Sequence, residues 1–355
     1  MTTETGSDAM STPFSRDAEA SNRGAAVTVT VIICAYTEDR WDQIKAAVAS
    51  VRHQMTGPDQ VVLVIDHNDQ LLHRATAAFP DVSVVANAGP PGLSGARNTG
   101  LTEAYGDVVA FLDDDAEAET DWLNRLVGHY ADPRVIGVGG RAVPSWDRAR
   151  PRWFPAEFLW VVGCTFTGQP TQVSPVRNVL GCNMSFRRAT LEGTGGSTPA
   201  RFDPALGRVG TKPIGCEETE FCIRLRRRHA PGEIRYDPAA GVRHLVTAER
   251  STWNYFRRRC YSEGRSKAVV ARLAGVESGL SAERQYTRST LPRGVARELR
   301  SSIADPAGLL RAVAIVAGLI ITACGYLAGG LRRRAERQPA ALPLRTPVAA
   351  SAEER

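Results

Sequence analysis

The spacing of apolar residues in the first third of the chain predicts alternating strands and helices. Continuous runs rich in β-branched residues predict buried strands at 27–34, 61–65, 82–86 and 108–112. Apolar residues at helical spacing predict intervening helices at about 41–53, 70–79 and 94–105, the last capped by Ser94. This alternation favours an α/β fold with a mostly parallel, Rossmann-like sheet, helices on both faces and right-handed connections.

The pattern is less regular after residue 135. Short apolar runs predict strands at 135–143, 182–186, 234–236 and 242–245, and helical spacing predicts helices at 216–228 and 252–273. The second of these helices is expected to carry Arg257-Arg258-Arg259 on its surface. Residues 144–175 are rich in Trp, Phe and Pro without clear periodicity. Such a segment is either a functional lid or acceptor platform, or a packed surface excursion.

A long uncharged segment lies near the end of the chain. Residues 312–331 contain no charged side chain, and Arg332-Arg333-Arg334 follow directly. This length is sufficient to cross a bilayer, although a surface-lying hairpin and a buried core helix are alternatives. Basic residues on both sides leave the orientation undetermined. We therefore divide the chain into a disordered leader (1–26), an α/β domain (27–250), a helical region (251–305), a membrane-spanning or membrane-associated helix (309–331) and a disordered basic tail (332–355).

Charge and cysteine content exclude several classes of protein. The net charge is +6, and Arg clusters in the second half could meet phosphates or anionic lipid. The chain lacks a basic motif interleaved with aromatic residues, so a nucleic-acid partner is not expected. The seven cysteines include no C-x-x-C pair, which argues against a zinc site or a disulfide framework and favours a reducing cytosol. No apolar run precedes Val27, so a cleaved signal peptide is not expected either.

Three consecutive carboxylates, Asp113-Asp114-Asp115, follow the buried strand at 108–112. Carboxylates this close repel one another and would not remain unpaired in a folded core. A divalent cation such as Mg²⁺ or Mn²⁺ would resolve the conflict, since it takes oxygen ligands. The alternative interpretation is a solvated acidic turn.

Other polar residues are expected at the same edge of the sheet. Asp66, Asp113 and Asp115 follow successive strands, and Tyr36 and Glu38 follow the first strand. The carboxyl ends of parallel strands share one edge. Arg97 lies near the start of a helix whose free N–H groups favour an anion. A cation, an anion site and acidic acceptors in one crevice describe a nucleotide-diphosphate site. Neither a G-x-G-x-x-G motif after the first strand nor a P-loop is present.

Together these motifs resemble those of family 2 glycosyltransferases of GT-A fold, over about residues 27–250. The residues that carry the resemblance are Cys34-Ala35-Tyr36-Thr37, Val64-Ile65-Asp66, Gly95-Ala96-Arg97-Asn98-Thr99-Gly100, Phe111-Leu112-Asp113-Asp114-Asp115, Gly181-Cys182-Asn183-Met184-Ser185-Phe186-Arg187-Arg188 and Glu217-Glu218-Thr219-Glu220-Phe221-Cys222-Ile223-Arg224.

The resemblance implies a role for each matching position. Ala35, Tyr36, Glu38 and Asp66 would bind the nucleotide, and Arg97 would contact its base or phosphate. Asp113 and Asp115 would hold Mn²⁺ or Mg²⁺ and the nucleotide sugar. Because alternate residues of an extended chain share a side, we expect Asp114 to point elsewhere, toward the donor sugar. The strand of Asn183 would line the donor sugar and the acceptor. The family usually has Glu-Asp where this chain has Glu217-Glu218, so Glu218 would be the catalytic base, with Glu217 as the alternative. His244 would be a third metal ligand, or else a satisfied core histidine.

The resemblance also implies an inverting hexosyltransferase that uses a nucleotide-sugar donor. A Gln-x-x-Arg-Trp motif is absent, which favours single addition over processive synthesis. The acceptor would be a glycan, a lipid carrier or a small molecule, handled by residues 146–160 and 252–273. We expect the enzyme at the cell membrane, facing the cytoplasm, in the synthesis of cell-envelope glycans. The alternatives are a sugar-phosphate nucleotidyltransferase and a non-catalytic, membrane-tethered protein that binds nucleotide sugars.

Overall fold

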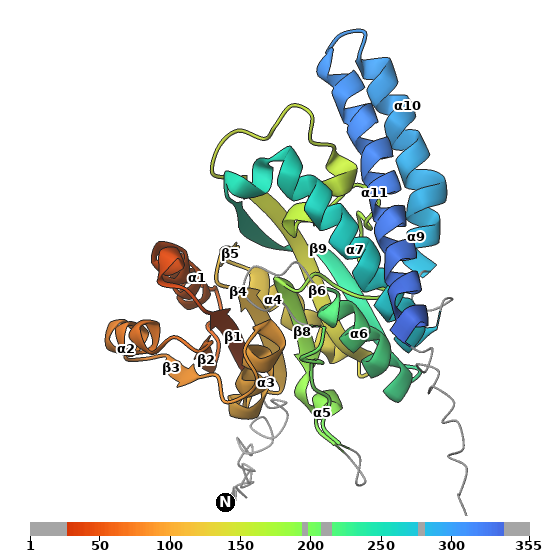
Figure 1. Ribbon diagram of the computed structural model, residues 1–355. Coiled ribbons are helices and arrows are strands. Elements are labelled where there is room, and N and C mark those ends of the chain that lie inside the picture. Colours follow the sequence, from red (N-terminus) through yellow and green to blue (C-terminus); the bar gives the residue numbers. More distant parts are fainter. Residues whose placement is uncertain (1–26, 194–197, 207–214, 276–280, 337–355) are drawn as a thin grey trace, which may run out of the picture.

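A computed structural model describes residues 27–193, 198–206, 215–275 and 281–336. The leader predicted at 1–26 and most of the predicted basic tail, 337–355, lie outside the described residues. The predicted α/β class is confirmed, and the described strands form a single mixed sheet in the order β3-β2-β1-β4-β8-β6-β9-β5, with β7 on β9 (Figure 1).

The first half of the sheet is parallel, as the apolar pattern predicts. It consists of β1 (Val29–Ala35), β2 (Gln60–Ile65), β3 (Ser83–Ala86) and β4 (Val108–Asp113), connected through α1 (Trp41–Arg52), α2 (Asp69–Ala78) and α3 (Leu93–Glu103). A short 3₁₀ helix, η2 (Glu38–Arg40), precedes α1. The predicted cap of α3 is wrong: Gly92 occupies the N-cap position with φ +118°, and Ser94 is buried inside the first turn.

The second half of the sheet includes antiparallel pairs, which the sequence pattern did not predict. β8 (Asn183–Arg187) runs antiparallel between β4 and β6 (Val135–Trp146). β5 (Ala116–Ala118) and β7 (Ser174–Val176) both pair antiparallel with β9 (Glu233–Val246). Helices α4 (Trp122–Gly128), α5 (Arg188–Leu191) and α6 (Glu217–Arg228), with the 3₁₀ turn η3 (His129–Ala131), complete this part.

The two short strands predicted at 234–236 and 242–245 form one strand, β9, with a bulge. Asp237 pairs with Gly140 of β6, but the next β6 residue, Arg141, pairs with Gly241. The extra β9 residues crowd Gly140, where a Cβ would lie 1.8 Å from the carbonyl oxygen of Ala240. Glycine is therefore required at this position of β6.

Alternate residues of the strands supply cores on both faces of the sheet. Val31 and Ile33 of β1 face one core with α1, α2 and α4, whereas Ile32 faces the other with α3 and α6. Since neighbouring strand residues point to opposite faces, the continuous apolar runs seen in the sequence are explained by this double coverage.

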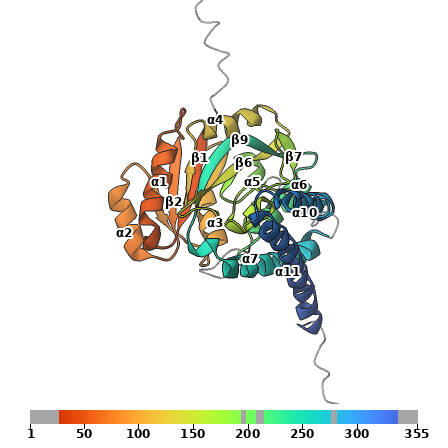
Figure 2. The same ribbon diagram turned by 90° about the horizontal axis from the view of Figure 1, so that it is seen from above.

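The C-terminal helices form a separate layer beside the sheet (Figures 1 and 2). The layer comprises η5 (Glu249–Ser251), α7 (Trp253–Ala274), α9 (Ser281–Gln285), the π-helical turn η6 (Tyr286–Thr290), α10 (Leu291–Ser301) and α11 (Ala307–Glu336). Helix α11 packs along α7 and α10. Within the described part of the chain, one helix is long and apolar enough to cross a membrane, over Ala307–Leu331.

The aromatic segment after β6 packs between the sheet and this helical layer. Phe154 and Phe158, the latter in η4 (Ala156–Val162), contact Phe256 of α7 in a third core that also includes Ile315 of α11. Residues 144–175 are therefore packed in one part, and in another part Trp160, Phe166 and Gln169 line the cavity described below. The prediction for Arg259 of α7 is wrong: its side chain is buried and pairs with Glu263, while Arg257 and Arg258 are exposed.

Candidate functional site

The ends of β1, β2 and β4 meet at one edge of the sheet, as predicted. Asp66 follows β2, and its carboxylate is fixed by its neighbours: Oδ1 accepts from Asn87 Nδ2 at 2.6 Å, and Oδ2 accepts from the Gly92 N–H at 2.8 Å. Both donors lie in or beside the loop that leads into α3. This arrangement fixes the carboxylate at the edge of the sheet where β2 ends.

Two carboxylates and an imidazole gather where β4, β5 and β9 come together. One potential ligand atom from each of Asp113, Asp115 and His244 lies within 4.8 Å of the others. The pairing of β5 with β9 sets this position, because Ala116 lies opposite His244. Carboxylate oxygens and imidazole nitrogens are ligands that Mn²⁺ accepts, and Asp113 and His244 also line a cavity. The residues present therefore fit a divalent cation.

Cations of the protein balance the buried carboxylates. Arg40 of η2 lies 2.8 Å from Asp114 and 3.3 Å from Asp115, and Arg250 of η5 lies 3.3 Å from Asp115. Burial raises the pKa of Asp115, but His244, Arg250 and Arg40 outweigh it and hold that pKa well below its usual range. Burial and the Asp115 charge raise the pKa of Asp114 to about 7. The Asp114 side chain is turned toward Arg40, so the structure does not direct it to the donor sugar.

His244 is held by contacts on both sides of its ring. Its Nε2 lies 3.2 Å from Asp115 Oδ1, and its Nδ1 lies 3.8 Å from the sulfur of Cys164. Burial lowers the pKa of His244, but the Asp115 carboxylate more than offsets this and raises the pKa to about 10. An arriving cation would therefore replace a proton on this ring.

Arg97 connects Asp113 of the metal site to Glu217, the residue before the predicted base. Its guanidinium is buried and donates to Asp113 Oδ1 at 3.3 Å, to Glu217 Oε1 at 3.1 Å and to the Gly181 carbonyl at 3.0 Å. Burial lowers the pKa of Arg97, but the charges of Asp113 and Glu217 outweigh burial and raise this pKa above its usual value. The side chain therefore stays charged. Arg97 is thus a fixed cation between the two acidic groups of the site.

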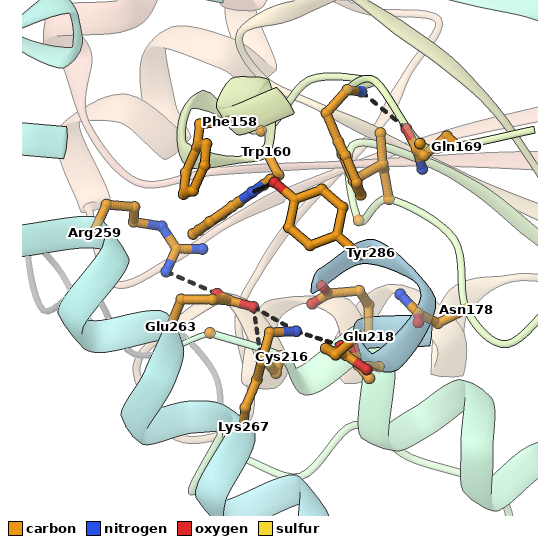
Figure 3. A pocket seen from close by; sticks show the side chains of 18 of the residues that line it. Phe158, Trp160, Gln169, Asn178, Cys216, Glu218, Arg259, Glu263, Lys267 and Tyr286 are labelled. Carbon is orange, nitrogen blue, oxygen red and sulfur yellow. Dashed lines mark hydrogen bonds and ion pairs between the residues drawn. The ribbon is translucent and has the colours of Figure 1, made fainter. Parts of the chain in front are cut away.

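Glu217 and Glu218 begin α6, and a strained residue positions them. Cys216, just before them, has φ +86°, a left-handed conformation that is costly for any residue other than glycine. The Cys216 thiol donates to Glu263 of α7 at 3.3 Å, which ties the start of α6 to the helical layer (Figure 3).

The two glutamates have different surroundings. Glu217 is buried and paired with Arg97, whereas Glu218 is half-buried and lines the cavity. Burial and the Glu217 charge raise the pKa of Glu218 to about 8. A carboxylate with such a pKa holds a proton strongly enough to act as a general base near neutral pH.

A cavity of about 1090 Å³ connects these groups to the helical layer. One end is lined by Arg97, Asp113, Glu217, His244 and Arg250. Toward the other end, Figure 3 shows Trp160 and Tyr286 above Glu263 and Lys267, with Glu218 directed into the same space. The Trp160 Nε1–H donates to the Tyr286 hydroxyl at 3.1 Å. We call this second end the aromatic end, where aromatic rings lie opposite the ion pair of Glu263 and Lys267.

The structure separates the predicted site residues into three groups. Arg97, Asp113, Glu217, Glu218 and His244 line the cavity. Other predicted residues lie along the same edge but outside the cavity lining, namely Ala35, Tyr36, Glu38, Asp66, Asp114 and Asp115.

Asn183 stands apart from both groups. Its amide is fully buried, accepts from Trp122 Nε1 at 2.8 Å and donates to the carbonyls of Arg141 and Ala240 at 3.0 and 2.9 Å. Because every partner belongs to the protein interior, the side chain holds β8, α4 and the β9 bulge together. The structure thus gives this side chain a role in the interior, and its contact with the donor stays a prediction.

Sequence reasoning missed the two arginines that face the acidic cluster. Arg40 and Arg250 are far from Asp115 in sequence, and neither belongs to a motif that marked it. One signal was available: three adjacent carboxylates at a buried strand end require nearby cations, and Arg40 closes the turn after the first strand.

Comparisons with known proteins agree on one kind of enzyme. Residues 30–195 match the sequence profile of Glycosyl transferase family 2. The glucosyl-dolichyl phosphate glucuronosyltransferase of Haloferax volcanii is 32% identical over 308 residues, which cover 85% of this chain and 96% of that protein. The pre-mycofactocin glycosyltransferase of Mycobacterium tuberculosis is 29% identical over 180 residues, half of this chain and 35% of that protein.

A solved structure resembles the whole fold. The mannosyltransferase PcManGT from Pyrobaculum calidifontis, in complex with GDP-Man and Mn²⁺, superposes with a TM-score of 0.53 at 18% identity, covering 88% of each chain. The expected glycosyltransferase fold is thereby confirmed.

Proposed function

Since this chain belongs to glycosyl transferase family 2, we propose that it is an inverting, metal-dependent enzyme that moves one sugar from a nucleotide-diphosphate sugar to an acceptor hydroxyl. The observation that carries the proposal is a single cavity that brings together Arg97, Glu218 and two members of the Asp113–Asp115–His244 cluster, namely Asp113 and His244.

The donor would lie across the edge of the sheet. Asp66 and the residues after β1, Ala35, Tyr36 and Glu38, would face the nucleoside. Asp113, Asp115 and His244 would hold Mn²⁺ or Mg²⁺. When bound, this cation would neutralise the charge of the diphosphate and of the departing nucleotide. Arg97 and Arg250 line the same part of the cavity and would add fixed positive charge to it.

Glu218 would act as the base. Its carboxylate, directed into the cavity, would take the proton of the acceptor hydroxyl, whose oxygen then attacks the anomeric carbon from the face opposite the leaving diphosphate. The bond from oxygen to the anomeric carbon forms as the bond to the diphosphate breaks, so the configuration inverts. Glu217 would remain paired with Arg97 and position the start of α6.

We propose further that the enzyme works at a membrane, with its catalytic domain in the cytoplasm. The support is the apolar helix α11 and the relative from Haloferax volcanii, whose name gives a dolichyl phosphate-linked substrate. A lipid-linked acceptor is therefore favoured over a soluble glycan. The alternative of a sugar-phosphate nucleotidyltransferase loses its support, since the family and its relatives are glycosyltransferases.

The test is a screen of purified protein against a panel of nucleotide sugars, with thermal unfolding as the readout. At least one donor should raise the melting temperature with Mn²⁺, lose this effect in EDTA and regain it when Mn²⁺ is restored. Asp115→Asn should abolish the shift, whereas Asp121→Asn, which alters a pair with Arg125 outside the cavity lining, should retain it. A panel without any Mn²⁺-dependent shift, or full stabilisation of Asp115→Asn, would refute the assignment of the donor site.

A further inference from the structure

One face of α11 is apolar and exposed along most of the helix. Its large residues recur every three or four positions, so they lie on one side of the helix. From the first to the last they extend about 33 Å. They are between 46% and 65% exposed, and we call them the apolar stripe: Leu309, Val313, Val316, Ile320, Leu327 and Leu331. Ala323 and Cys324 are exposed at the same spacing.

The opposite face of α11 is fixed to the catalytic domain. Gly325 lies so close to α7 that a Cβ there would be 2.1 Å from the carbonyl oxygen of Tyr261. A Cβ on Gly264 of α7 would likewise be 2.0 Å from the carbonyl oxygen of Thr322. Nearer its beginning, Gly318 packs against the ring of Phe158 in η4. Helix α11 therefore cannot move into a membrane without α7 and the aromatic segment.

This packing argues against a helix that crosses a bilayer. α7 carries Arg257, Arg258 and Arg265 as exposed residues, and a crossing α11 would take them toward the hydrocarbon, where charged side chains are very costly. A helix lying flat needs to bury only the apolar stripe, and nearby arginines can reach the head groups. Only a third of the most apolar window of α11 is buried, so the helix is not a core helix either.

The cavity of the catalytic site reaches the apolar stripe. Four residues of α11 show this: Leu319 and Tyr326 line the cavity from the flank of the helix, and Ala323 and Leu327 line it from the exposed side. Leu327 is 63% exposed, so it belongs both to the cavity and to the stripe. Across the cavity from α11, the lining includes Tyr286 and Thr287 of η6. The aromatic end of the cavity thus opens at the apolar surface.

We propose that α11 lies in the plane of a membrane surface with the apolar stripe in the lipid, and that the cavity opens sideways into that lipid between α11 and η6. The acceptor is then an amphiphile whose apolar chain stays in the lipid while its polar head passes Tyr286 and reaches Glu218. This description of the acceptor rests on the proposed function, whereas the position of α11 does not.

The test measures the depth of single labelled cysteines in vesicles of phosphatidylcholine and phosphatidylglycerol. Cys324 is exposed, the other cysteines are buried or half-buried, and Cys324→Ser provides the background. In that background, Leu309→Cys, Val316→Cys and Leu331→Cys probe the stripe, Tyr326→Cys probes the cavity and Met55→Cys, an exposed residue distant in sequence, is the control. An environment-sensitive fluorophore on each is quenched by lipids that carry a nitroxide near the head group or near the bilayer centre.

A flat helix predicts the same shallow depth at positions 309, 316 and 331, quenching at 326, and none at 55. Depths that change steadily along the helix would show that it crosses the bilayer and would overturn the proposal. Absence of quenching at the stripe would overturn it too, and light scattering would then reveal whether a second copy of the chain covers the stripe. Quenching at the stripe but not at 326 would refute the sideways entrance. Donor-induced thermal stabilisation of the same variants tests the proposed function separately.

Discussion

The pair Glu217 and Glu218 offers the sharpest test of the chemistry, because the two residues should respond in opposite ways to the same substitution. Glu218 lines the cavity, and its pKa is raised to about 8 by burial and by the Glu217 charge. Glu217 is paired with Arg97 instead. We therefore expect Glu218→Gln to remove the base. Glu217→Gln should keep the base and alter only the pKa of Glu218.

The magnitudes follow from the ionised fraction of the base. With a pKa of about 8, roughly one Glu218 in ten is ionised at pH 7 and roughly one in a hundred at pH 6. The kcat at saturating donor should thus rise about tenfold per pH unit below neutrality and level off above about pH 9. Loss of a general base costs about 10²- to 10⁴-fold, which is the decrease expected for Glu218→Gln.

Glu217→Gln should shift this profile toward lower pH. Removing a like charge favours the ionised form of Glu218, so its pKa falls and the substituted enzyme gains activity at pH 6 relative to its own plateau. Arg97 retains its contacts with Asp113 and the Gly181 carbonyl, so the guanidinium remains in place.

The assay is release of nucleoside diphosphate at saturating donor and acceptor, measured from pH 5.5 to 9.5 for the wild type and both variants. Thermal stabilisation by the donor confirms that each variant still binds it. A profile that is flat from pH 6 to 8 in the wild type would refute the assignment of the raised pKa to the base. Loss of transfer in Glu217→Gln with activity retained in Glu218→Gln would exchange the roles of the two residues.

Three further substitutions test structural roles. Asn183→Leu should destabilise the fold by about 3 kcal/mol, since it leaves the Trp122 N–H and two carbonyls unpaired, and it should leave the donor Kd unchanged. A weaker donor Kd with unchanged urea unfolding would instead show that Asn183 contacts the donor. Arg97→Met should cost about 3–5 kcal/mol in urea unfolding, because Glu217 would lose its buried partner, and an unchanged midpoint would contradict that pairing. Gly264→Leu should cost about 1–3 kcal/mol by forcing α7 and α11 apart, and it should lower the melting temperature more than Gly128→Leu, where a Cβ meets nothing within 4 Å.

The donor side of the site could be predicted because its geometry is local to the strands. Asp66 and Asp113 each end or follow a strand that the apolar pattern marks, and parallel strands bring such ends to one edge. His244 required more than this pattern. Its place beside Asp115 depends on the pairing of β5 with β9, which joins segments more than a hundred residues apart, and only the family resemblance indicated it.

The remaining differences arise where a side chain serves the interior. Asn183 occupies a motif position, yet its amide is hydrogen-bonded to Trp122 and to two backbone carbonyls of the interior. Arg259 belongs to a run of three arginines whose sequence suggests a uniform basic surface, but the helix turns it inward toward Glu263. Sequence patterns show which residues are polar, whereas the partner that satisfies a buried polar group is set by tertiary packing.

The bulge in β9 decides which side chain can reach the acidic cluster. Tyr236 lies opposite Gly139, and after the bulge Arg243 lies opposite Val143, a β6 residue on the same face as Gly139. Because the bulge adds an odd number of residues to β9, His244 points to the opposite face of the sheet, where it contacts Asp115. Arg243 is left exposed. A regular strand of the same composition would offer the cluster a guanidinium in place of an imidazole. The ability of this sheet edge to accept a cation therefore depends on the parity of a short insertion as much as on the identity of any ligand.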